Sequence, residues 1–95
     1  MDVVIRHYKG APELADELVR RKDDVEQLIR EIPGFVAYHL VKTSDGAFSV
    51  SIYQDASGTQ ESVRAAAEYM RTNLPSLTIS PPEVIEGESV ISFSA

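Results

Sequence analysis

The sequence contains no cysteine and no tryptophan, and it has only two histidines among its 95 residues. The absence of cysteine excludes disulfide bonds, thiolate metal sites and cysteine nucleophiles. Basic residues are also scarce, since nine lysines and arginines stand against fifteen acidic residues, for a net charge of −6. This excess of acid repels a phosphate backbone, so we do not expect the chain to bind nucleic acid.

Long apolar runs are missing as well. No stretch approaches the roughly 18 consecutive apolar residues of a membrane-spanning helix. The first ten residues, MDVVIRHYKG, carry an acid at position 2 and lack the apolar segment of a signal peptide. We therefore expect a cytoplasmic protein that has no membrane partner. The length and the average composition predict a single domain over residues 1–95.

The two histidines, His7 and His39, do not form a metal-binding pattern, because neither an HxH nor an HxxxH spacing is present. Without cysteine, a metal site would need both imidazoles and additional carboxylates. We therefore expect no metal, and nothing in the sequence indicates another cofactor.

Four segments have the β-branched and aromatic composition of strands. They are Val3–Tyr8, Phe35–Lys42, Ala47–Tyr53 and Val84–Phe93. The third alternates strictly between apolar and polar residues, which is typical of a strand with two different faces. In the fourth segment, Gly87 suggests a bulge or a bend.

Two segments have the periodicity of amphipathic helices. The first runs from Pro12 to about Glu31, with apolar residues at three- and four-residue spacing. The second runs from about Thr59 to Asn73. Three residues are candidates for its N-cap: Asp55, Ser57 and Thr59. Ser57 also fits a capping box, because a glutamine follows three positions later.

Asp45-Gly46 separates the second and third strand segments, and this dipeptide is a strong hairpin signal. The element order is therefore β-α-β-β-α-β, which predicts the ferredoxin-like arrangement of the α+β class. In that arrangement, a four-stranded antiparallel sheet carries two helices on one face.

Both faces of the predicted sheet are apolar. We expect the helices to cover the face that contains Phe48, Val50, Ile52, Val3 and Ile5. The opposite face would then present Val4, Tyr8 and apolar residues of the second and fourth strands. Exposed apolar patches of this size are uncommon on monomers. We therefore expect two chains to pack sheet against sheet as a homodimer.

The segment Arg30–Tyr53 places a Pro-Gly-Phe step after a helix and before a hairpin. The second helix contains Ala66-Ala67-Glu68-Tyr69, and Leu74-Pro75 follows it. In these features the chain resembles the antibiotic biosynthesis monooxygenase-like proteins of the dimeric α/β-barrel superfamily. The likeness covers nearly the whole chain, and its motifs are structural, without a catalytic signature.

The resemblance implies a homodimer, a dimeric α/β barrel with a cavity in each subunit. Some of these relatives oxidise aromatic polyketides or quinols without metal or flavin, others degrade haem, and many have no known activity. The haem-degrading branch uses an asparagine, a tryptophan and a haem-ligating histidine. This chain has no tryptophan, and its single asparagine, Asn73, lies at the end of a helix. This departure from the residues of the haem-degrading branch disfavours haem degradation.

Two residues are candidates for polar chemistry in such a cavity. His39 has the near-neutral pKa range of a general base and is the candidate catalytic residue; alternatively, it contacts a neighbour at the dimer interface. Arg6 is a cation within an apolar strand and would bind a carboxylate or enolate of a ligand. Alternatively, Arg6 reaches an acid such as Glu86 or Glu88, or water at the edge of the sheet.

Three tyrosines of the predicted strands, Tyr8, Tyr38 and Tyr53, are candidates for binding a small aromatic ligand. Their alternative role is in the core or the interface. Ser49 and Ser51 share a face with Tyr53 and form a small polar strip, but nothing indicates a serine nucleophile.

Two functions remain open from the sequence. The first is a cofactor-independent monooxygenase that acts on an aromatic or quinol-type small molecule. The second is a non-catalytic small-molecule-binding or stress-response dimeric barrel. An RNA-recognition module has the same element order, but it needs basic and aromatic residues on its central strands. Here Ser49 and Ser51 occupy those positions.

Overall fold

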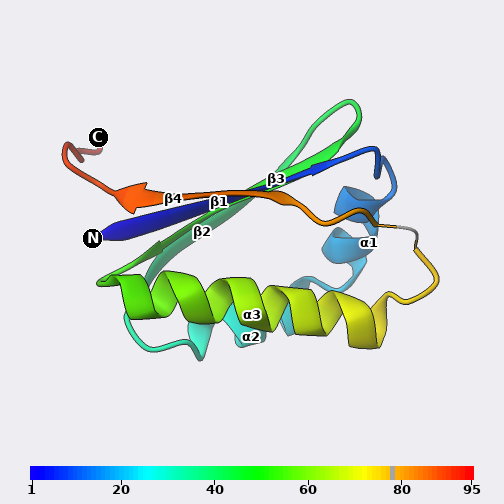
Figure 1. Ribbon diagram of the computed structural model, residues 1–95, viewed down its shortest axis with the longest axis horizontal. Coiled ribbons are helices and arrows are strands. Elements are labelled where there is room, and N and C mark those ends of the chain that lie inside the picture. Colours follow the sequence, from blue (N-terminus) through cyan, green and yellow to red (C-terminus); the bar gives the residue numbers. More distant parts are fainter. Residues whose placement is uncertain (78) are drawn as a thin grey trace.

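The computed structural model describes residues 1–77 and 79–95, and within them it contains three helices and one four-stranded antiparallel sheet (Figure 1). The strand order is β2-β3-β1-β4, as the ferredoxin-like prediction requires. The elements are β1 (Asp2–Lys9), α1 (Leu14–Arg20), α2 (Lys22–Arg30), β2 (Phe35–Lys42), β3 (Gly46–Tyr53), α3 (Ala56–Asn73) and β4 (Glu83–Glu88).

The first predicted helix is wrong in one respect, because the chain forms two helices, α1 and α2, that meet at Arg21. Arg21 leaves helical geometry with φ −107° and ψ 27°. The apolar stripe explains the break. It contains Leu18 and Val25 but no apolar residue between them, apart from the exposed Val19. Nothing therefore holds this turn against the sheet.

Strand β4 ends at Glu88, earlier than the predicted Phe93, and the residues after it have no regular structure. The predicted bulge at Gly87 is also wrong, because β4 pairs with β1 in unbroken register from Asp2↔Glu88 to His7↔Glu83. The irregularity lies in β2 instead, between Phe35 and Ala37. All six residues of β4 are exposed, and three of them are glutamates.

The predicted hairpin joins β2 and β3, and the amide of Thr43 donates a hydrogen bond to the Gly46 carbonyl at 3.0 Å. The Asp-Gly turn suggested a positive φ at Gly46, but Gly46 does not have one. Its role is close approach, because a Cβ at this position would lie 1.9 Å from the carbonyl oxygen of Tyr8. Any side chain here would force β1 and β3 apart.

Helix α3 begins three residues earlier than predicted. Of the three candidate caps, Asp55 is the one used, and its Oδ1 accepts a hydrogen bond from the Ser57 amide at 3.0 Å. The capping box at Ser57 does not form, since Ser57 lies inside the helix. The first turn of α3 packs on the Tyr53 side chain, and a Cβ on Gly58 would lie 2.7 Å from three atoms of that side chain.

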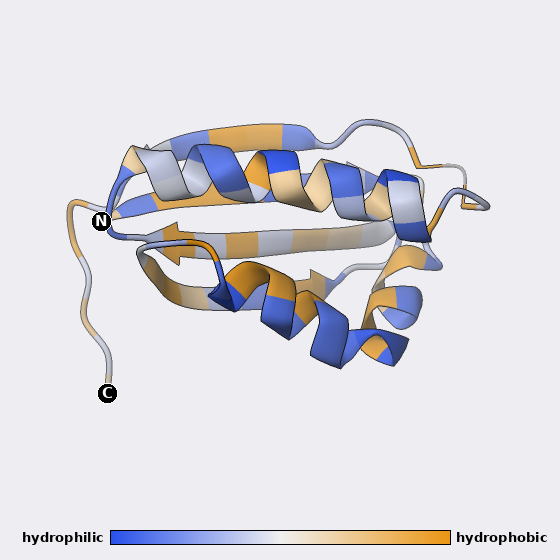
Figure 2. Ribbon diagram, turned by 90° about the horizontal axis from the view of Figure 1, so that it is seen from below, coloured by the Kyte–Doolittle hydropathy of each residue, from blue (hydrophilic) through white to orange (hydrophobic). Residues whose placement is uncertain are grey.

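All three helices lie on one side of the sheet (Figure 2). They cover the face opposite to the one we expected. On β1 the buried residues are Val4, Arg6 and Tyr8, while Val3 and Ile5 are only partly buried on the other face. The same inversion holds for β3, whose buried residues are Ala47, Ser49, Ser51 and Tyr53, and whose outer residues are Phe48, Val50 and Ile52.

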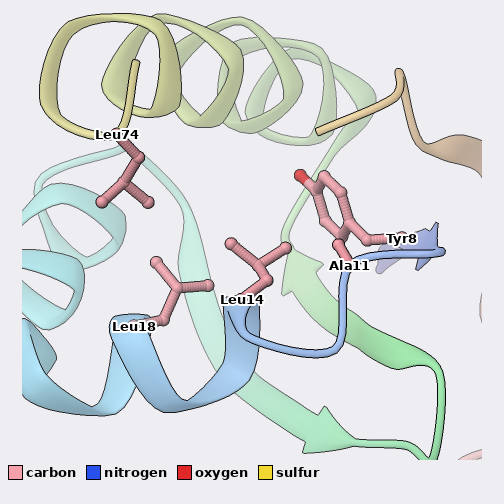
Figure 3. Packing of buried hydrophobic residues seen from close by; sticks show 5 residues of the cluster. All are labelled: Tyr8, Ala11, Leu14, Leu18 and Leu74. Carbon is pink, nitrogen blue, oxygen red and sulfur yellow. The ribbon is translucent and has the colours of Figure 1, made fainter. Parts of the chain in front are cut away.

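The apolar core between sheet and helices consists of two separate clusters. The first contains Tyr8 and Leu74 together with residues of α1, and Figure 3 shows its side chains converging. The second joins Tyr53 to Ile29, Ile32 and Ala65. Between the two clusters, β1 and β3 carry polar side chains on the face that the helices cover. This polar zone is the setting of the candidate site.

Within residues 1–77 and 79–95, no helix combines the length and the apolar character needed to cross a membrane.

Candidate functional site

Arg6 places a positive charge in the interior of the protein. The residue is 3 % exposed, and its side chain projects from the middle of β1 towards the helices. Its Nη1 donates a hydrogen bond to the Ser62 hydroxyl of α3 at 3.4 Å, while Nε has no partner within the described residues. An arginine side chain has five N–H donors and is always charged. The site therefore holds a cation with unused donors.

No carboxylate neutralises Arg6 in the part of the chain that the structure describes. The ion pairs found there all involve other basic residues, on the helices or near the strand ends. The predicted pairing with Glu86 or Glu88 does not occur, because all of β4 is exposed. Leaving a buried charge without a partner costs several kcal/mol of folding free energy.

Three further polar groups around Arg6 are buried and without hydrogen-bond partners among the described residues: the hydroxyls of Ser49, Ser51 and Tyr53. Ser49 pairs directly with Arg6 across the β1–β3 ladder, and Ser51 is the next residue on the same face. Each unsatisfied buried group costs about 1–3 kcal/mol. A cluster of such groups on one face is unusual for a purely structural core.

Burial raises the pKa of the Tyr8 hydroxyl above its ordinary value of 10.0, and the positive charge of Arg6 only partly opposes this shift. Burial also raises the pKa values of Tyr38 and Tyr53, with Arg6 again acting in the opposite direction. All three phenols are therefore neutral near pH 7. In that state they donate hydrogen bonds to a ligand and do not supply the missing negative charge.

A small cavity of about 20 Å³ lies beside Arg6, between the sheet and the helices. Its polar lining consists of Arg6, Tyr8, Tyr38 and Ser49. Apolar side chains complete its wall: Leu18, Val25, Leu28, Ile29, Leu40, Ala66 and Met70, together with the ring of Tyr69. The volume is sufficient for about one water-sized group.

A larger hollow of about 630 Å³ lies next to this cavity, between α3, β1 and β4. Arg6, Tyr8 and Met70 line both spaces, so they form a shared wall. The described lining of the larger hollow includes a second cation, Arg71, and no acidic residue. The rest is mostly apolar, as in pockets that bind small organic molecules.

A third hollow, of about 340 Å³, opens between α1, α2 and β2. Tyr38 and Leu40 belong both to its wall and to that of the small cavity. Lys22, Glu26 and Arg30 stand at its rim, and Arg30 pairs with Glu26 at 2.8 Å. The 20 Å³ cavity thus has residues in common with both larger spaces.

The structure brings together three of the five side chains that the sequence selected, Arg6, Tyr8 and Tyr38, at one cavity. Tyr53 is fully buried on the same face but lies in the second apolar cluster, edge-to-face with Phe35 at 6.0 Å between ring centroids. His39 is exposed on the outer face, opposite Val50 in the ladder. It does not touch the cavity, so its assignment as the catalytic base has no geometric support.

Sequence reasoning missed Ser62, the hydrogen-bond acceptor of Arg6. Its hydroxyl also donates to the Thr59 carbonyl at 2.8 Å, which fixes its orientation within α3. The available signal was a serine in an alanine-rich helix face, one turn before Ala65 and Ala66. Among residues 1–77 and 79–95, no cluster of histidine and acidic side chains has the geometry to hold a metal ion.

Comparison with known proteins identifies the fold. No protein-family model matches the sequence, and no curated protein matches it. Solved structures do match. MhuD, the haem degrader of Mycobacterium tuberculosis, here with two haems bound in its active site, superimposes with a TM-score of 0.71 at 17 % identity, covering 99 % of this chain and 100 % of its own.

A monooxygenase from the ActVA-Orf6 gene of Streptomyces coelicolor, in complex with nanaomycin D, matches with a TM-score of 0.68 at 19 % identity, over 99 % of this chain and 90 % of that one. A proposed antibiotic biosynthesis monooxygenase from Deinococcus radiodurans matches with a TM-score of 0.72 at 13 % identity, over 100 % and 98 % of the two chains. This chain has their fold. The resemblance noted in the sequence is therefore confirmed at the level of the fold, the ferredoxin-like fold of antibiotic biosynthesis monooxygenases.

Proposed function

We propose that the chain is a cofactor-independent monooxygenase that acts on an aromatic, quinol-type small molecule. The observation that carries this proposal is Arg6, a buried cation without a carboxylate partner among the described residues, in the wall of a 630 Å³ hollow that has no acidic residue in its described lining. In a chain of net charge −6, such a site favours an anionic or ionisable ligand.

The proposed role of Arg6 is to stabilise the ionised oxygen of the ligand. A guanidinium in an interior site strengthens the binding of a phenolate or enolate, because charge-assisted hydrogen bonds are stronger where water is excluded. Tyr8 adds a neutral hydrogen-bond donor in the same wall. The apolar side chains of the hollow, including Met70 and Val63, would pack against the rings of the ligand.

The ionised ligand is electron-rich and is the reductant for dioxygen in this proposal. In the simplest case a ring CH₂ group, which loses one proton when the enolate forms, becomes a carbonyl. One oxygen atom of O₂ enters that carbon, and the other leaves as water with the two hydrogens of the same carbon. The four electrons that reduce O₂ come from that carbon, so this reaction consumes no separate reductant.

A non-catalytic role in binding a small molecule is the second candidate, and one observation favours it. None of the described side chains that line the small cavity or the 630 Å³ hollow is a general base near neutral pH, since these linings contain no histidine or acid. Ionisation of the ligand would then have to precede binding. The same site would in that case hold the ionised compound without oxidising it.

We also propose that the protein is a homodimer, in which the outer sheet face meets the same face of a second copy. The residues of this face align in rows across the strands, and the central row is His39, Val50, Ile5 and Ile85. A neighbouring row contains Val41, Phe48 and His7. Ile85 is 53 % exposed and Val41 37 %, so the single chain leaves apolar surface uncovered.

The C-terminal segment after β4 supports the same proposal. Val90, Ile91 and Phe93 are each at least 80 % exposed. The segment extends away from the body of the molecule beyond the end of the sheet (Figure 1). Isolated apolar side chains on a projecting arm are stabilised when they pack against a partner.

A cytoplasmic location stays a prediction from the sequence.

The test of the proposed function measures oxygen uptake and the quinone absorbance with a panel of anthrones and quinols. The wild type is compared with Arg6→Met, which removes the cation at similar volume, and with His39→Ala, which lies on the other face. We expect Arg6→Met to lower kcat/KM by about 10²–10³-fold, whereas His39→Ala leaves the rate per folded protein unchanged.

Three other outcomes change the conclusion. Binding of the panel compounds without oxygen uptake supports the non-catalytic alternative. Equal rates for the wild type and Arg6→Met remove Arg6 from the mechanism. A loss of activity in His39→Ala that is not explained by a change in assembly restores the histidine as a candidate base.

A further inference from the structure

The 20 Å³ cavity has an unusual set of polar groups. Its side chains Arg6, Ser49, Tyr8 and Tyr38 can all donate hydrogen bonds, and Arg6 contributes a full positive charge. Tyr69 also lines the cavity, but its hydroxyl donates to Asp24. The described lining includes no aspartate, glutamate or histidine. Arg6 and Ser49 are 3 % and 1 % exposed, and both contain a polar atom without a partner in the described protein. A group that accepts hydrogen bonds and carries negative charge would complement this lining.

The size of the cavity limits what can fill it. About 20 Å³ is sufficient for one water-sized group and is too small for an aromatic ring or a sulfate. A monatomic halide ion satisfies both requirements, because it accepts several hydrogen bonds and offsets the charge of a buried guanidinium. The apolar side chains of Leu18, Val25 and Met70 would pack against the ion in this wall.

We propose that the cavity beside Arg6 binds a single halide ion, such as chloride, held by the Arg6 guanidinium and the Ser49 hydroxyl with Tyr8 and Tyr38 as further donors. This inference goes beyond the proposed function and does not depend on any oxidation. It has a consequence for that function, because Arg6 also lines the 630 Å³ hollow. A halide on Arg6 competes with the ionised oxygen of an organic ligand, so the ion would act as a resident inhibitor.

The neutral state of the surrounding phenols supports the assignment of an anion from outside the chain. Burial raises the pKa values of Tyr8 and Tyr38, so neither serves as a phenolate counter-ion for Arg6 near pH 7. Ser62 is already committed as a donor to the backbone of α3, and towards Arg6 it acts only as an acceptor.

The test is a halide titration of thermal stability at constant ionic strength. Sodium chloride or sodium bromide replaces sodium gluconate, whose anion is too large for the cavity. We expect the Tm of the wild type to rise with the logarithm of the chloride concentration, by about 5 °C or more for each tenfold increase above its dissociation constant. Arg6→Met should show no such rise. Ser49→Ala should keep it with an affinity about tenfold weaker, because it loses one hydrogen bond to a charged group.

Arg20→Met is the matched control. Arg20 lies on the exposed side of α1, where it pairs with Glu17, and its replacement removes the same charge far from the cavity. We expect Arg20→Met to respond to chloride as the wild type does. If the wild type, Arg6→Met and Arg20→Met all respond alike, or if the wild type does not respond, the proposal is overturned.

A second measurement covers the case in which Arg6→Met does not fold. Crystals of the wild type grown in bromide should give an anomalous peak within hydrogen-bonding distance of Arg6 and Ser49, and the absence of that peak contradicts the proposal. The proposed function fails separately, through the lack of ligand binding or oxygen uptake in halide-free gluconate. Chloride that stabilises the protein but does not compete with a bound quinol would confine the ion to a structural role.

Discussion

At the scale of single residues, the interior combines very close packing with unsatisfied polar groups. Gly58 lies so close to Tyr53 that a Cβ would meet its side chain at 2.7 Å, while the Tyr53 hydroxyl has no partner among the described residues. A sequence pattern can indicate Arg6, because a cation in an apolar strand is unusual. It cannot indicate Ser62, because that contact depends on how α3 is placed over the sheet.

The contact between Gly58 and Tyr53 leads to a prediction for Gly58→Ala. Replacing glycine by alanine inside a helix ordinarily stabilises it by up to about 1 kcal/mol. Here the added methyl group overlaps the Tyr53 side chain, so we expect a net loss of roughly 1–3 kcal/mol in the free energy of unfolding. Urea denaturation measures this loss.

Gly87→Ala is the control for this substitution, because a Cβ on Gly87 meets nothing within 4 Å. This variant should unfold within about 0.5 kcal/mol of the wild type. Similar effects of the two substitutions would show that the close contact between α3 and Tyr53 does not restrict position 58.

At the scale of elements, the order of strands and helices could be predicted, but the faces of the sheet could not. Alternation in β3 separates Phe48 and Val50 from Ser49 and Ser51 correctly. A pattern of this kind shows which residues share a face, and it does not show which layer covers that face. The covered face of β3 holds mainly small and polar residues, and the buried residues of α3 include the small side chains of Ser62 and Ala65 as well as Gly58.

The bulge in β2 explains why one candidate residue of this strand, Tyr38, packs in the core while the other, His39, is exposed. The register shift between Phe35 and Ala37 changes the alternation, so Phe35 and Tyr38 both pack against the second core cluster. His39 consequently faces outward. Nothing in the residue types of this segment marks the bulge, because Phe35, Val36 and Ala37 are all compatible with a regular strand.

Helix α3 is expected to lose its N-cap in acid. Hydrogen bonds from the Ser57 side chain and backbone lower the pKa of Asp55 below its ordinary value of 3.8. The ionised cap therefore stabilises the folded state at neutral pH, and this contribution disappears as the pH falls through the lowered pKa. Asp55→Ala should have a lower Tm than the wild type near pH 7, with a smaller difference near pH 2.

Asp55→Asn is the matched control, since its amide oxygen still accepts the hydrogen bond from Ser57 without a titrating group. Its Tm should stay close to that of the wild type near pH 7. A difference between wild type and Asp55→Ala that does not change with pH would contradict the role of ionisation in the cap. Thermal unfolding followed by circular dichroism measures all three proteins.

At the scale of the whole molecule, the helices cover one side of the sheet and leave an apolar side open. The proposed dimer makes Ile5 and Val50 central to the interface, since they pair in the middle of the outer face. Ile5→Glu would place one unpaired carboxylate from each copy in the buried region. Because each such charge costs about 3–5 kcal/mol and the dimer would contain two of them, we expect its dissociation constant to rise by roughly 10⁴-fold or more.

Val19→Glu is the control for assembly, because Val19 is 65 % exposed on α1, away from the outer sheet face. It should leave the dimer intact. Sedimentation velocity at micromolar concentration distinguishes the species. A wild-type protein that sediments as a compact monomer would remove the basis of the proposed interface.

The acidic edge strand has its own consequence. Strand β4 lies at the border of the sheet, fully exposed, with glutamates at positions 83, 86 and 88. An unpaired edge is a template on which further strands can grow into ribbons and fibrils. Growth along β4 would press the glutamates of one copy against those of the next, and their repulsion opposes it. The chain can therefore expose an apolar sheet face for dimer formation while its acidic edge strand opposes open-ended aggregation.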